Sequence, residues 1–285
     1  MNLFERAKFF RTKKRLGQNF LINSDVIQEI LDFAQISEDD TVIEIGAGVG
    51  FVTEQLVKKA KKVIAIEIDE EAINELKKLD ADNLVLVHQD ILKTDISKLS
   101  VEENNGQKFK VVANIPYYIT APIVAHLLGE IDDLENKNRN SVSEIVLMVQ
   151  EEVARRMVAN EKSPSKQYGL LSVLAQFWSE CSIIRLVGRK SFYPAPKVNS
   201  ALVSLKINNS PKLELSDYSF FKRVIKAAFS QRRKNIKNCL VNNGFDKNLV
   251  KSVLQNLGID ENLRGEAVSI SKFGELSEEF LKCMK

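Results

Sequence analysis

Between residues 25 and 149 the sequence alternates helix-like segments with short β-branched runs, and this alternation restricts the fold more than any other feature. The strand-like runs lie at 41–45, 63–66, 84–87, 111–113 and 145–149. The helix-like segments, at 25–33, 51–59, 70–79 and 121–128, carry apolar residues three and four positions apart. Strands that alternate with helices form a parallel sheet covered by those helices, so the pattern predicts an α/β fold.

The second half of the chain changes character twice. A polar stretch at 135–141 has no periodicity, and we expect a variable surface loop there. After a helical segment at 168–178, strand-like runs at 182–187 and 201–207 flank the Pro-rich segment 192–198, which predicts antiparallel strands that complete a mixed sheet. Turn residues at 208–211 mark a boundary, because only helical patterns follow. The sequence therefore predicts a catalytic domain over 1–208, with a basic segment at 1–24, and a small all-α domain over 209–285.

The charge of the chain is informative through its distribution. A net charge of +3 on 285 residues is too small to indicate a nucleic-acid partner by itself. Basic residues nevertheless crowd the N-terminus, at Lys8, Arg11, Lys13, Lys14 and Arg15, and fill 222–237, which lacks Asp and Glu. Each cluster is either a solvated face or a surface for an anionic partner.

The cysteines and the apolar segments place limits on the environment of the protein. Cys181, Cys239 and Cys283 are far apart and have no paired spacing, so neither a disulfide framework nor a metal site is predicted. The sequence shows no signal peptide and no apolar run long enough for a membrane span. We expect a cytoplasmic protein with no membrane association.

A glycine-rich turn follows the first predicted strand and opens a helix. Its spacing, Gly46-Ala47-Gly48-Val49-Gly50, differs from the G-x-G-x-x-G of dinucleotide-binding folds, which argues against a bound pyrophosphate. Glu67 ends the next strand about twenty residues later, where an acid accepts ribose hydroxyls. Asp90 follows the third strand and is suited to an adenine amine, although a solvated strand end is the alternative. An adenosine site without a phosphate cradle favours S-adenosylmethionine over NAD.

The tetrapeptide Asn114-Ile115-Pro116-Tyr117 closes the fourth strand. The amide oxygen of Asn114 can accept a hydrogen bond from an exocyclic amine, Pro116 fixes the backbone, and Tyr117 offers a flat face to a base. An ordinary turn after a strand is the alternative. Gly46, Glu67, Asp90 and Asn114 end four successive strands, so we expect them at one edge of the sheet, where open α/β sheets bind ligands.

Six segments together resemble the ribosomal RNA adenine dimethyltransferases of the KsgA/RsmA family, within the class I (Rossmann-like) methyltransferase fold. These segments are 14–21, 44–50, 67–69, 90–92, 114–117 and 192–198. The resemblance implies that S-adenosylmethionine is contacted by Asn19, Leu21, Gly46, Glu67, Asp90 and Asn114. It also implies dimethylation of N6 on two adjacent adenosines in a hairpin loop near the 3′ end of 16S rRNA, in the assembling 30S particle. Ile115 departs from the family, whose members often carry Leu there.

The predicted mechanism polarises the adenine amine. The oxygen of Asn114 and a backbone carbonyl near Pro116 would accept the two N6 hydrogens and direct the nitrogen lone pair toward the methyl donor. Tyr117 would stack on the base, and Phe192 would close its other face. We expect His88 and His126 to be structural and the protein to be a monomer. The residues predicted to bind RNA phosphates are Arg232, Arg233, Lys234 and Lys237.

Three other functions are compatible with parts of the sequence. An Erm-type enzyme that methylates 23S rRNA shares the catalytic core, but the segment 229–240 resembles the KsgA/RsmA branch. A non-catalytic RNA-binding assembly factor on the same fold would not need the intact cofactor and Asn-x-Pro-Tyr positions. An NAD oxidoreductase is disfavoured by the glycine spacing.

Overall fold

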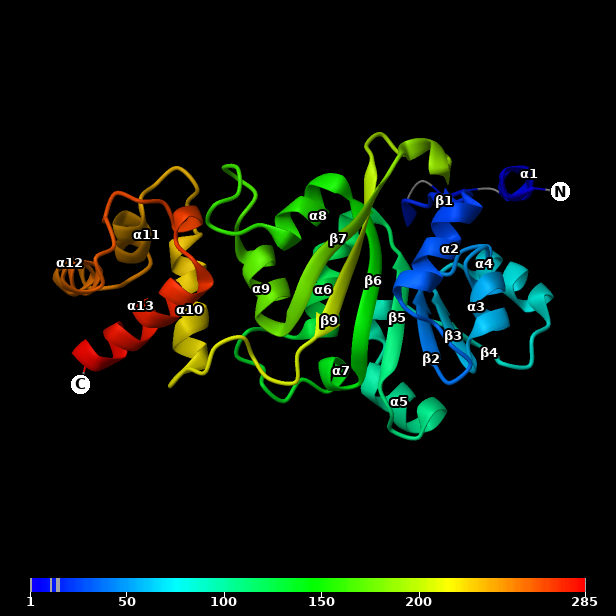
Figure 1. The fold of residues 1–285 in the computed structure, drawn as a ribbon, viewed down its shortest axis with the longest axis horizontal. Coiled ribbons are helices and arrows are strands. Elements are labelled where there is room, and N and C mark those ends of the chain that lie inside the picture. Colours follow the sequence, from blue (N-terminus) through cyan, green and yellow to red (C-terminus); the bar gives the residue numbers. More distant parts are fainter. Residues whose placement is uncertain (1, 11, 14–15, 285) are drawn as a thin grey trace. The chain divides into compact units, whose positions relative to one another are not determined.

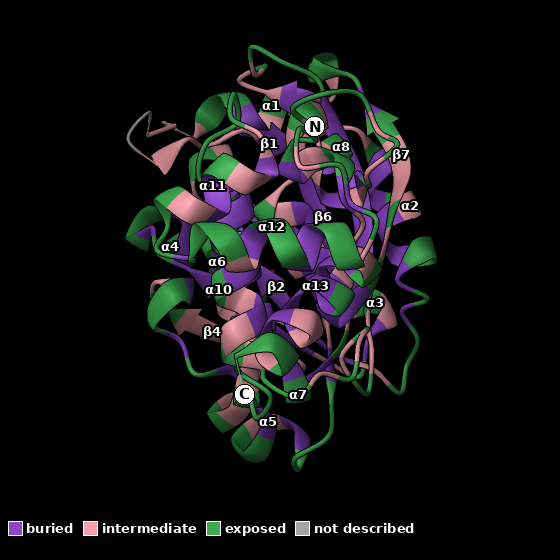
Figure 2. Ribbon diagram, turned by 90° about the vertical axis from the view of Figure 1, so that its left-hand side faces the viewer, coloured by how far each residue is buried: buried purple, intermediate pink, exposed green. Residues whose placement is uncertain are grey.

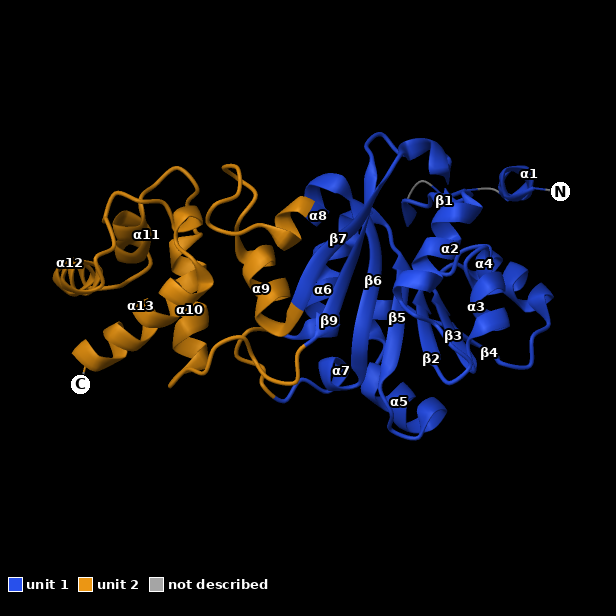
Figure 3. Cartoon of the chain, viewed as in Figure 1, with its two compact units in different colours: residues 1–129, 135–154, 180–207 blue, residues 130–134, 155–179, 208–285 orange. Residues whose placement is uncertain are grey.

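The structure, a computed structural model, describes residues 2–10, 12–13 and 16–284. The described chain divides into two compact units (Figure 3). Unit 1 contains 1–129, 135–154 and 180–207, and unit 2 contains 130–134, 155–179 and 208–285. Two segments that precede residue 208 thus fall in unit 2. The predicted division into domains 1–208 and 209–285 stays a prediction.

Unit 1 is built on a sheet that has seven strands within the described residues (Figure 1). The strands, in sheet order, are β4 (Leu84–His88), β3 (Lys62–Glu67), β2 (Thr41–Ile45), β5 (Phe109–Asn114), β6 (Val142–Gln150), β9 (Ser200–Ile207) and β7 (Ser179–Val187). The strands from β4 to β6 are parallel, and β9 runs antiparallel to β6. The predicted mixed sheet is therefore confirmed. Its chain order reverses between β2 and β5, the position at which such sheets bind ligands.

Helices cover both faces of this sheet, which explains why its inner strands are apolar throughout instead of alternating. Val42 on β2 shares a hydrophobic cluster with Ile27 and Leu56, which come from two helices on one face. On the same face, Ala65 on β3, two residues after the Val63 of this cluster, packs with Leu76. β2 is buried along its whole length, and Figure 2 draws buried residues in purple. The helices that supply these contacts are α2 (Ser24–Phe33), α3 (Thr53–Lys59) and α4 (Glu70–Leu76).

The remaining elements of unit 1 are short. They are α1 (Leu3–Phe9), η2 (Lys77–Leu79), η3 (Ile91–Lys93), α5 (Ile96–Asn104), η4 (Tyr117–Ile119), α6 (Thr120–Leu128), α7 (Lys137–Asn140) and η5 (Arg189–Ser191). Two-residue strands β1 (Phe20–Leu21) and β8 (Phe192–Tyr193) pair antiparallel, with Leu21 opposite Phe192. This pair fastens the segment before α2 to the Pro-rich segment.

The prediction of a surface loop at 135–141 is wrong in that a helix forms within it, whereas Glu135, Lys137 and Asn140 are exposed as expected. α7 lies within this stretch, and Arg139 is 3% exposed, with its guanidinium donating a hydrogen bond to the Leu128 carbonyl at 2.7 Å. Asn138 donates to the His126 carbonyl at 3.2 Å. Polar composition suggested exposure, but these side chains satisfy backbone carbonyls of α6 and hold the segment in place.

Unit 2 is helical. Its helices are α9 (Leu170–Trp178), α10 (Tyr218–Ala228), α11 (Ile236–Asn242), α12 (Lys247–Asn256), η6 (Gly265–Ala267) and α13 (Ile270–Cys283), and α8 (Glu151–Val158) contains the point where the two units meet in sequence. Side chains of Asp217, Asp246 and Ser269 cap α10, α12 and α13 by accepting backbone N–H bonds. Aromatic side chains form much of the core, and the rings of Phe245 and Phe280 lie 5.1 Å apart. The helical pattern predicted beyond residue 211 is confirmed.

Among the described residues, no helix combines the length and the apolar character that crossing a bilayer requires.

Candidate active site at the carboxyl edge of the sheet

A cavity of about 310 Å³ lies in unit 1, where β2, β3, β4 and β5 end. Its volume is at the lower end of the roughly 300–1,000 Å³ typical of small-molecule sites. The predicted residues that line it are Asn19, Leu21, Gly46, Glu67, Asp90, Asn114, Pro116 and Tyr117. Four strand ends and the segment before α2 therefore meet around one space, as the strand order requires.

The glycine turn forms part of the cavity wall. Gly46 has φ +73°, a conformation that favours glycine, and a Cβ there would lie 3.4 Å from the carbonyl oxygen of Asn114. Gly48 has φ +56°, and its N–H donates to Oε2 of Glu67 at 2.8 Å. The absence of side chains lets the turn lie close to β5 and leaves the cavity open.

Glu67 is fixed by the backbone around it. Its carboxylate accepts N–H bonds from Gly48, Ile68 and Asp69 at 2.8, 2.9 and 2.9 Å. Burial raises the pKa of Glu67, and these three hydrogen bonds oppose the rise. An ionised carboxylate has about four acceptor positions, so at least one stays available to a ligand hydroxyl.

Glu44 is a second acid at the cavity, and the sequence interpretation gave it no role. It lies on β2, is 3% exposed and accepts a hydrogen bond from the Thr53 hydroxyl at 2.6 Å. Burial raises the pKa of Glu44 to about 8, the Thr53 bond opposes this rise, and the charge of Glu67 adds to it. The sequence feature that could have indicated a role for Glu44 is an acidic residue inside an otherwise apolar strand.

The amide of Asn114 has one defined orientation. Its Nδ2 donates to the carbonyl oxygen of Asn19 at 3.1 Å, and both residues line the cavity. This bond assigns the NH₂ group to Asn19 and leaves Oδ1 without a donor among the described residues. The side chain therefore offers a hydrogen-bond acceptor to a ligand.

Two tyrosines follow Pro116. The Tyr117 hydroxyl lies 2.6 Å from the Ser200 hydroxyl, and burial raises the pKa of Tyr117, although this hydrogen bond lowers it. Tyr118 also lines the cavity and is 64% exposed, with its ring 3.3 Å from the Cβ position of Gly17. Tyr118 is an accessible aromatic surface that the sequence interpretation missed. Its position beside the tetrapeptide was the signal.

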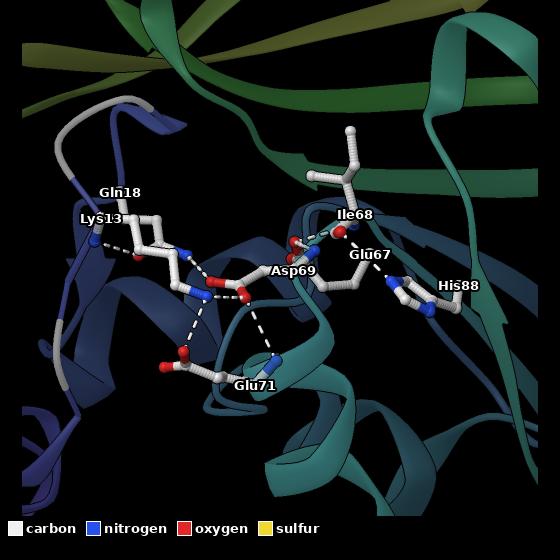
Figure 4. A network of polar contacts seen from close by, with 7 residues as sticks. All are labelled: Lys13, Gln18, Glu67, Ile68, Asp69, Glu71 and His88. Atoms are coloured by element: carbon white, nitrogen blue, oxygen red, sulfur yellow. Dashed lines mark hydrogen bonds and ion pairs between the residues drawn. The ribbon is translucent and has the colours of Figure 1, made fainter.

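The segment before α2 is tied to the start of α4 by a polar network (Figure 4). The Lys13 ammonium lies 2.5 Å from Asp69 and 3.0 Å from Glu71, and the Gln18 amide donates to Asp69 at 2.7 Å. Burial raises the pKa of Asp69, but the bonds from Lys13 and Gln18 outweigh this and hold it below its usual value. Asp69 also caps α4 by accepting the Glu71 N–H. The basic residues Arg11, Lys14 and Arg15 lie outside the described residues.

Asp90 and Phe192 differ in their access to the cavity. Asp90 lines it and accepts the Leu92 N–H at 3.0 Å. Phe192 does not line it: the ring is 3% exposed and belongs to the hydrophobic cluster around α2. That Phe192 closes one face of the target base stays a prediction: here β8 pairs with β1, and the ring packs in the core opposite Leu21, which lines the cavity.

The four predicted RNA-binding residues occupy two environments in unit 2. Arg232, Arg233 and Lys234 are exposed in the turn between α10 and α11. Lys237 lies on α11 and forms an ion pair with Glu261 at 2.8 Å. Three of the four are thus free to meet an anionic partner, and the fourth is partly neutralised.

The histidines make structural hydrogen bonds. His88 lies 3.2 Å from the Ile68 carbonyl, and His126 lies 2.9 Å from the Thr94 carbonyl. Neither lines the cavity. No cluster of three or more His, Cys, Asp or Glu suited to a metal occurs in the part of the chain that the structure describes.

Known proteins resemble this chain in both sequence and structure. Residues 9–282 match the family described as ribosomal RNA adenine dimethylase. The chain is 40% identical over 273 residues to ribosomal RNA small subunit methyltransferase A of Clostridium botulinum, with 94% of each chain covered.

Solved structures agree with this assignment. A dimethyladenosine transferase from Plasmodium falciparum has a TM-score of 0.73 at 28% identity, covering 91% of this chain and 96% of that one. The 23S rRNA methyltransferase ErmE has a TM-score of 0.67 at 26% identity, covering 92% and 99%.

These matches confirm the predicted methyltransferase fold, the enzyme class and S-adenosylmethionine as the cofactor. The chain belongs to the ribosomal RNA adenine dimethylase family.

Proposed function

We propose that the protein transfers methyl groups from S-adenosylmethionine to N6 of two adjacent adenosines in a hairpin loop near the 3′ end of 16S rRNA. The observation that carries this proposal is the orientation of the Asn114 amide, whose oxygen is left as an acceptor inside the cavity. The small-subunit target is supported by the relative from Clostridium botulinum, whose name specifies the small subunit. The partner we propose is the assembling 30S particle, with the protein acting as a cytoplasmic monomer.

The hydrogen-bonding groups that line the cavity match those of S-adenosylmethionine. Gly46 leaves space at the end of β2, and the Glu67 carboxylate keeps an acceptor position for a ribose hydroxyl. Asp90 would accept a bond from the adenine amine, and Asn19 and Leu21 would contact the remainder. The bound cofactor supplies an electrophilic methyl group on a positively charged sulfur.

Asn114 acts on the nucleophile. The lone pair of an adenine amine is delocalised into the ring, so the amine is a weak nucleophile until its geometry changes. Oδ1 of Asn114 accepts one N6 hydrogen, and a backbone carbonyl beside Pro116 accepts the other. The Pro116 carbonyl already accepts the Ile119 N–H at 3.2 Å, so we assign this role to the neighbouring Ile115 carbonyl.

The target base stacks on an aromatic side chain next to the tetrapeptide, as bases from RNA loops commonly do. Tyr117 lines the cavity with its hydroxyl engaged by Ser200, which fixes the ring. Tyr118 offers a second, exposed ring at the same cavity. Tyr117 and Tyr118 are the stacking surfaces that we propose, and Phe192 remains the side chain predicted to close the other face of the base.

RNA affinity comes from phosphate contacts made by the basic residues of unit 2. Arg232, Arg233 and Lys234 are exposed and make the larger contribution in this proposal. Lys237 contributes less, because Glu261 lies within 2.8 Å of its ammonium.

A methylation assay with two RNA substrates tests the proposed function. The protein and labelled S-adenosylmethionine are incubated with undermethylated small subunits and, separately, with 23S rRNA, and the modified adenosines are mapped. We expect N6,N6-dimethyladenosine at two adjacent positions near the 3′ end of 16S rRNA. Label confined to 23S rRNA would assign the Erm-type activity instead, and no transfer to either RNA would favour a non-catalytic factor.

A further inference from the structure

Unit 2 contains a cavity of its own, with a volume of about 120 Å³. Its walls come from three stretches of chain: the segment between α8 and α9, the turn after α10, and the segment around η6. All the residues that line it belong to unit 2. A water needs roughly 10–15 Å³ of such space, so the cavity has room for several waters or for a small polyatomic anion.

The cavity walls are strongly basic. Five cationic side chains line it, namely Arg156, Lys166, Arg232, Lys234 and Arg264. None of the five forms an ion pair within the residues that the structure describes. The single lining carboxylate, Glu266, already accepts hydrogen bonds from the Ser165 hydroxyl and the Lys166 N–H, each at 2.9 Å. Uncompensated positive charge around a concave surface attracts an anion.

A buried hydroxyl at the same cavity has no partner. Tyr168 lines the cavity and is 5% exposed, and its hydroxyl makes no hydrogen bond within the described part of the chain. The Tyr168 ring packs edge-on against Phe229, with ring centroids 5.5 Å apart. An unpaired buried hydroxyl is unfavourable, and such a group in a native protein calls for a partner that the chain itself does not provide.

The backbone around the cavity is held in a restricted conformation. Lys166 has φ +75°, which is uncommon for a residue with a side chain, and its N–H is fixed by Glu266. Gly265 packs so closely on α10 that a Cβ there would lie 2.6 Å from the Ala228 carbonyl oxygen. These contacts join the segment at 165–168 to η6 and α10, so the cationic side chains project from a fixed frame. Unusual backbone conformations that are held in this way cluster at ligand sites.

We propose that this cavity binds one phosphate group, held by Arg232, Lys234 and Arg156, with the Tyr168 hydroxyl as an additional donor. Guanidinium groups bind phosphate through two parallel N–H bonds, and an ammonium binds it as a point charge. The site differs from a general basic surface because it includes Tyr168 and excludes Arg233 and Lys237, which do not line the cavity.

The phosphate group has two possible sources. One is a phosphodiester of the RNA substrate, and this source rests on the proposed function. The other is a small phosphate compound, which would bind regardless of RNA. The chemistry of recognition is the same, so the experiment has one arm for each source.

Four variants of the full chain separate the site from its surroundings. Lys234→Gln and Tyr168→Phe change the cavity. Lys251→Gln and Tyr218→Phe are the matched controls, because neither residue lines the cavity. Lys251 is an exposed lysine of α12, and the Tyr218 hydroxyl donates to the Leu213 carbonyl. In chloride buffer Tyr168→Phe should melt no lower than the parent protein, since its hydroxyl has no partner to lose.

The first arm titrates inorganic phosphate against chloride at constant ionic strength and follows the melting temperature. We expect phosphate to stabilise the parent protein, with the apparent Kd about tenfold weaker in Lys234→Gln and about fivefold weaker in Tyr168→Phe. The controls should keep the parent Kd within about twofold. The second arm measures affinity for small-subunit RNA by filter binding. If Lys234→Gln weakens this affinity most, Tyr168→Phe less and the controls not at all, the ligand is an RNA phosphodiester.

Each outcome has a defined meaning. Changes in the phosphate arm with unchanged RNA affinity assign the cavity to a small phosphate compound. If Lys234→Gln binds phosphate and RNA as tightly as the parent protein does, the proposal is overturned. If Lys234→Gln binds more weakly but Tyr168→Phe does not, the role of the hydroxyl is overturned. Because the phosphate arm needs neither cofactor nor RNA, failure of the proposed methyl transfer would leave its result unaffected.

Discussion

At the scale of single residues, Tyr117 separates the function of a ring from that of a hydroxyl. If the ring stacks on the base, Tyr117→Phe should keep kcat within about threefold, whereas Tyr117→Ala should lose on the order of a hundredfold because stacking is worth roughly 1–3 kcal/mol per base. Tyr117→Phe also removes the bond to Ser200, so the free energy of unfolding should fall by about 0.5–1.5 kcal/mol. Steady-state methylation and urea denaturation provide the two measurements.

Ser200→Ala is the matched control for Tyr117→Phe, since it removes the other partner of the same hydrogen bond. It should reproduce the decrease in stability and leave kcat unchanged. Equal decreases of kcat in Tyr117→Phe and Tyr117→Ala would show that the hydroxyl, and not the ring, is the functional group.

Glu44 makes stability depend on pH. Its pKa of about 8 in the folded chain exceeds the ordinary value of 4.5, so between these pH values the folded state holds a proton that the unfolded state has released. The contribution of Glu44 to stability is therefore fully present below pH 4.5 and declines as the pH rises toward 8. We expect Glu44→Gln, which keeps the shape and removes the titration, to gain roughly 1–3 kcal/mol relative to the parent protein between pH 5 and pH 8.

Urea denaturation of both proteins at several pH values measures this difference. The free energy of unfolding of Glu44→Gln should still decrease somewhat as the pH rises, because burial also raises the pKa of Glu67. A constant difference between the two proteins from pH 5 to pH 8 would contradict the assignment of a protonated Glu44.

At the scale of elements, the turn between β2 and α3 carries a steric prediction. A Cβ at Gly48 would lie 3.1 Å from the ring of Phe20, a residue that lines the cavity, and its φ of +56° disfavours a side chain. Gly48→Ala should lose about 1–3 kcal/mol of stability and weaken S-adenosylmethionine binding at least tenfold.

Gly106→Ala is the matched control, since Gly106 has φ +74° but nothing within 4 Å of its Cβ position. Gly106→Ala should lose about 1 kcal/mol of stability from backbone strain alone. Its cofactor affinity, measured by calorimetry, should be unchanged. Equal effects in both variants would mean that the proximity of Phe20 is unimportant.

The inner strands of the sheet were predictable because burial on both faces demands continuous apolar β-branched runs, and the partly buried edge strand β4 is apolar as well. β2 was predicted with both of its ends, and β3, β4 and β6 within three residues. α5 and α8 were not predicted: α5 is polar with a weak apolar face, and α8 follows β6 with no turn residue between them. β1 and β8 are too short for any periodicity.

The site was predictable wherever strand order determines position. Gly46, Glu67, Asp90 and Asn114 share the cavity because parallel strands end at one edge. The burial of Phe192 was not predictable, because it results from the pairing of β1 with β8, which joins residues far apart in sequence. Tyr118 was missed because exposure depends on the packing of η4 and not on residue type.

At the scale of the whole molecule, RNA binding should depend on salt through the exposed cations of unit 2. Removing one phosphate-binding side chain lowers the slope of log K against log salt by roughly 1. Arg233→Gln should lower it by about this amount, whereas Lys237→Gln should lower it by less than half as much, because Lys237 is paired with Glu261. Filter binding to small-subunit RNA from about 50 to 200 mM salt measures both slopes. Identical slopes for the two variants and the parent protein would exclude these residues from the interface.

The most direct test of the account measures dimethylated adenosine formed on small subunits by the parent protein and by Asn114→Ala, with cofactor affinity determined in parallel. We expect two adjacent N6,N6-dimethyladenosines for the parent protein. For Asn114→Ala we expect a rate at least about a hundredfold lower, with S-adenosylmethionine affinity reduced by no more than about tenfold. Dimethylation by Asn114→Ala at the parent rate would contradict the central role of the Asn114 amide.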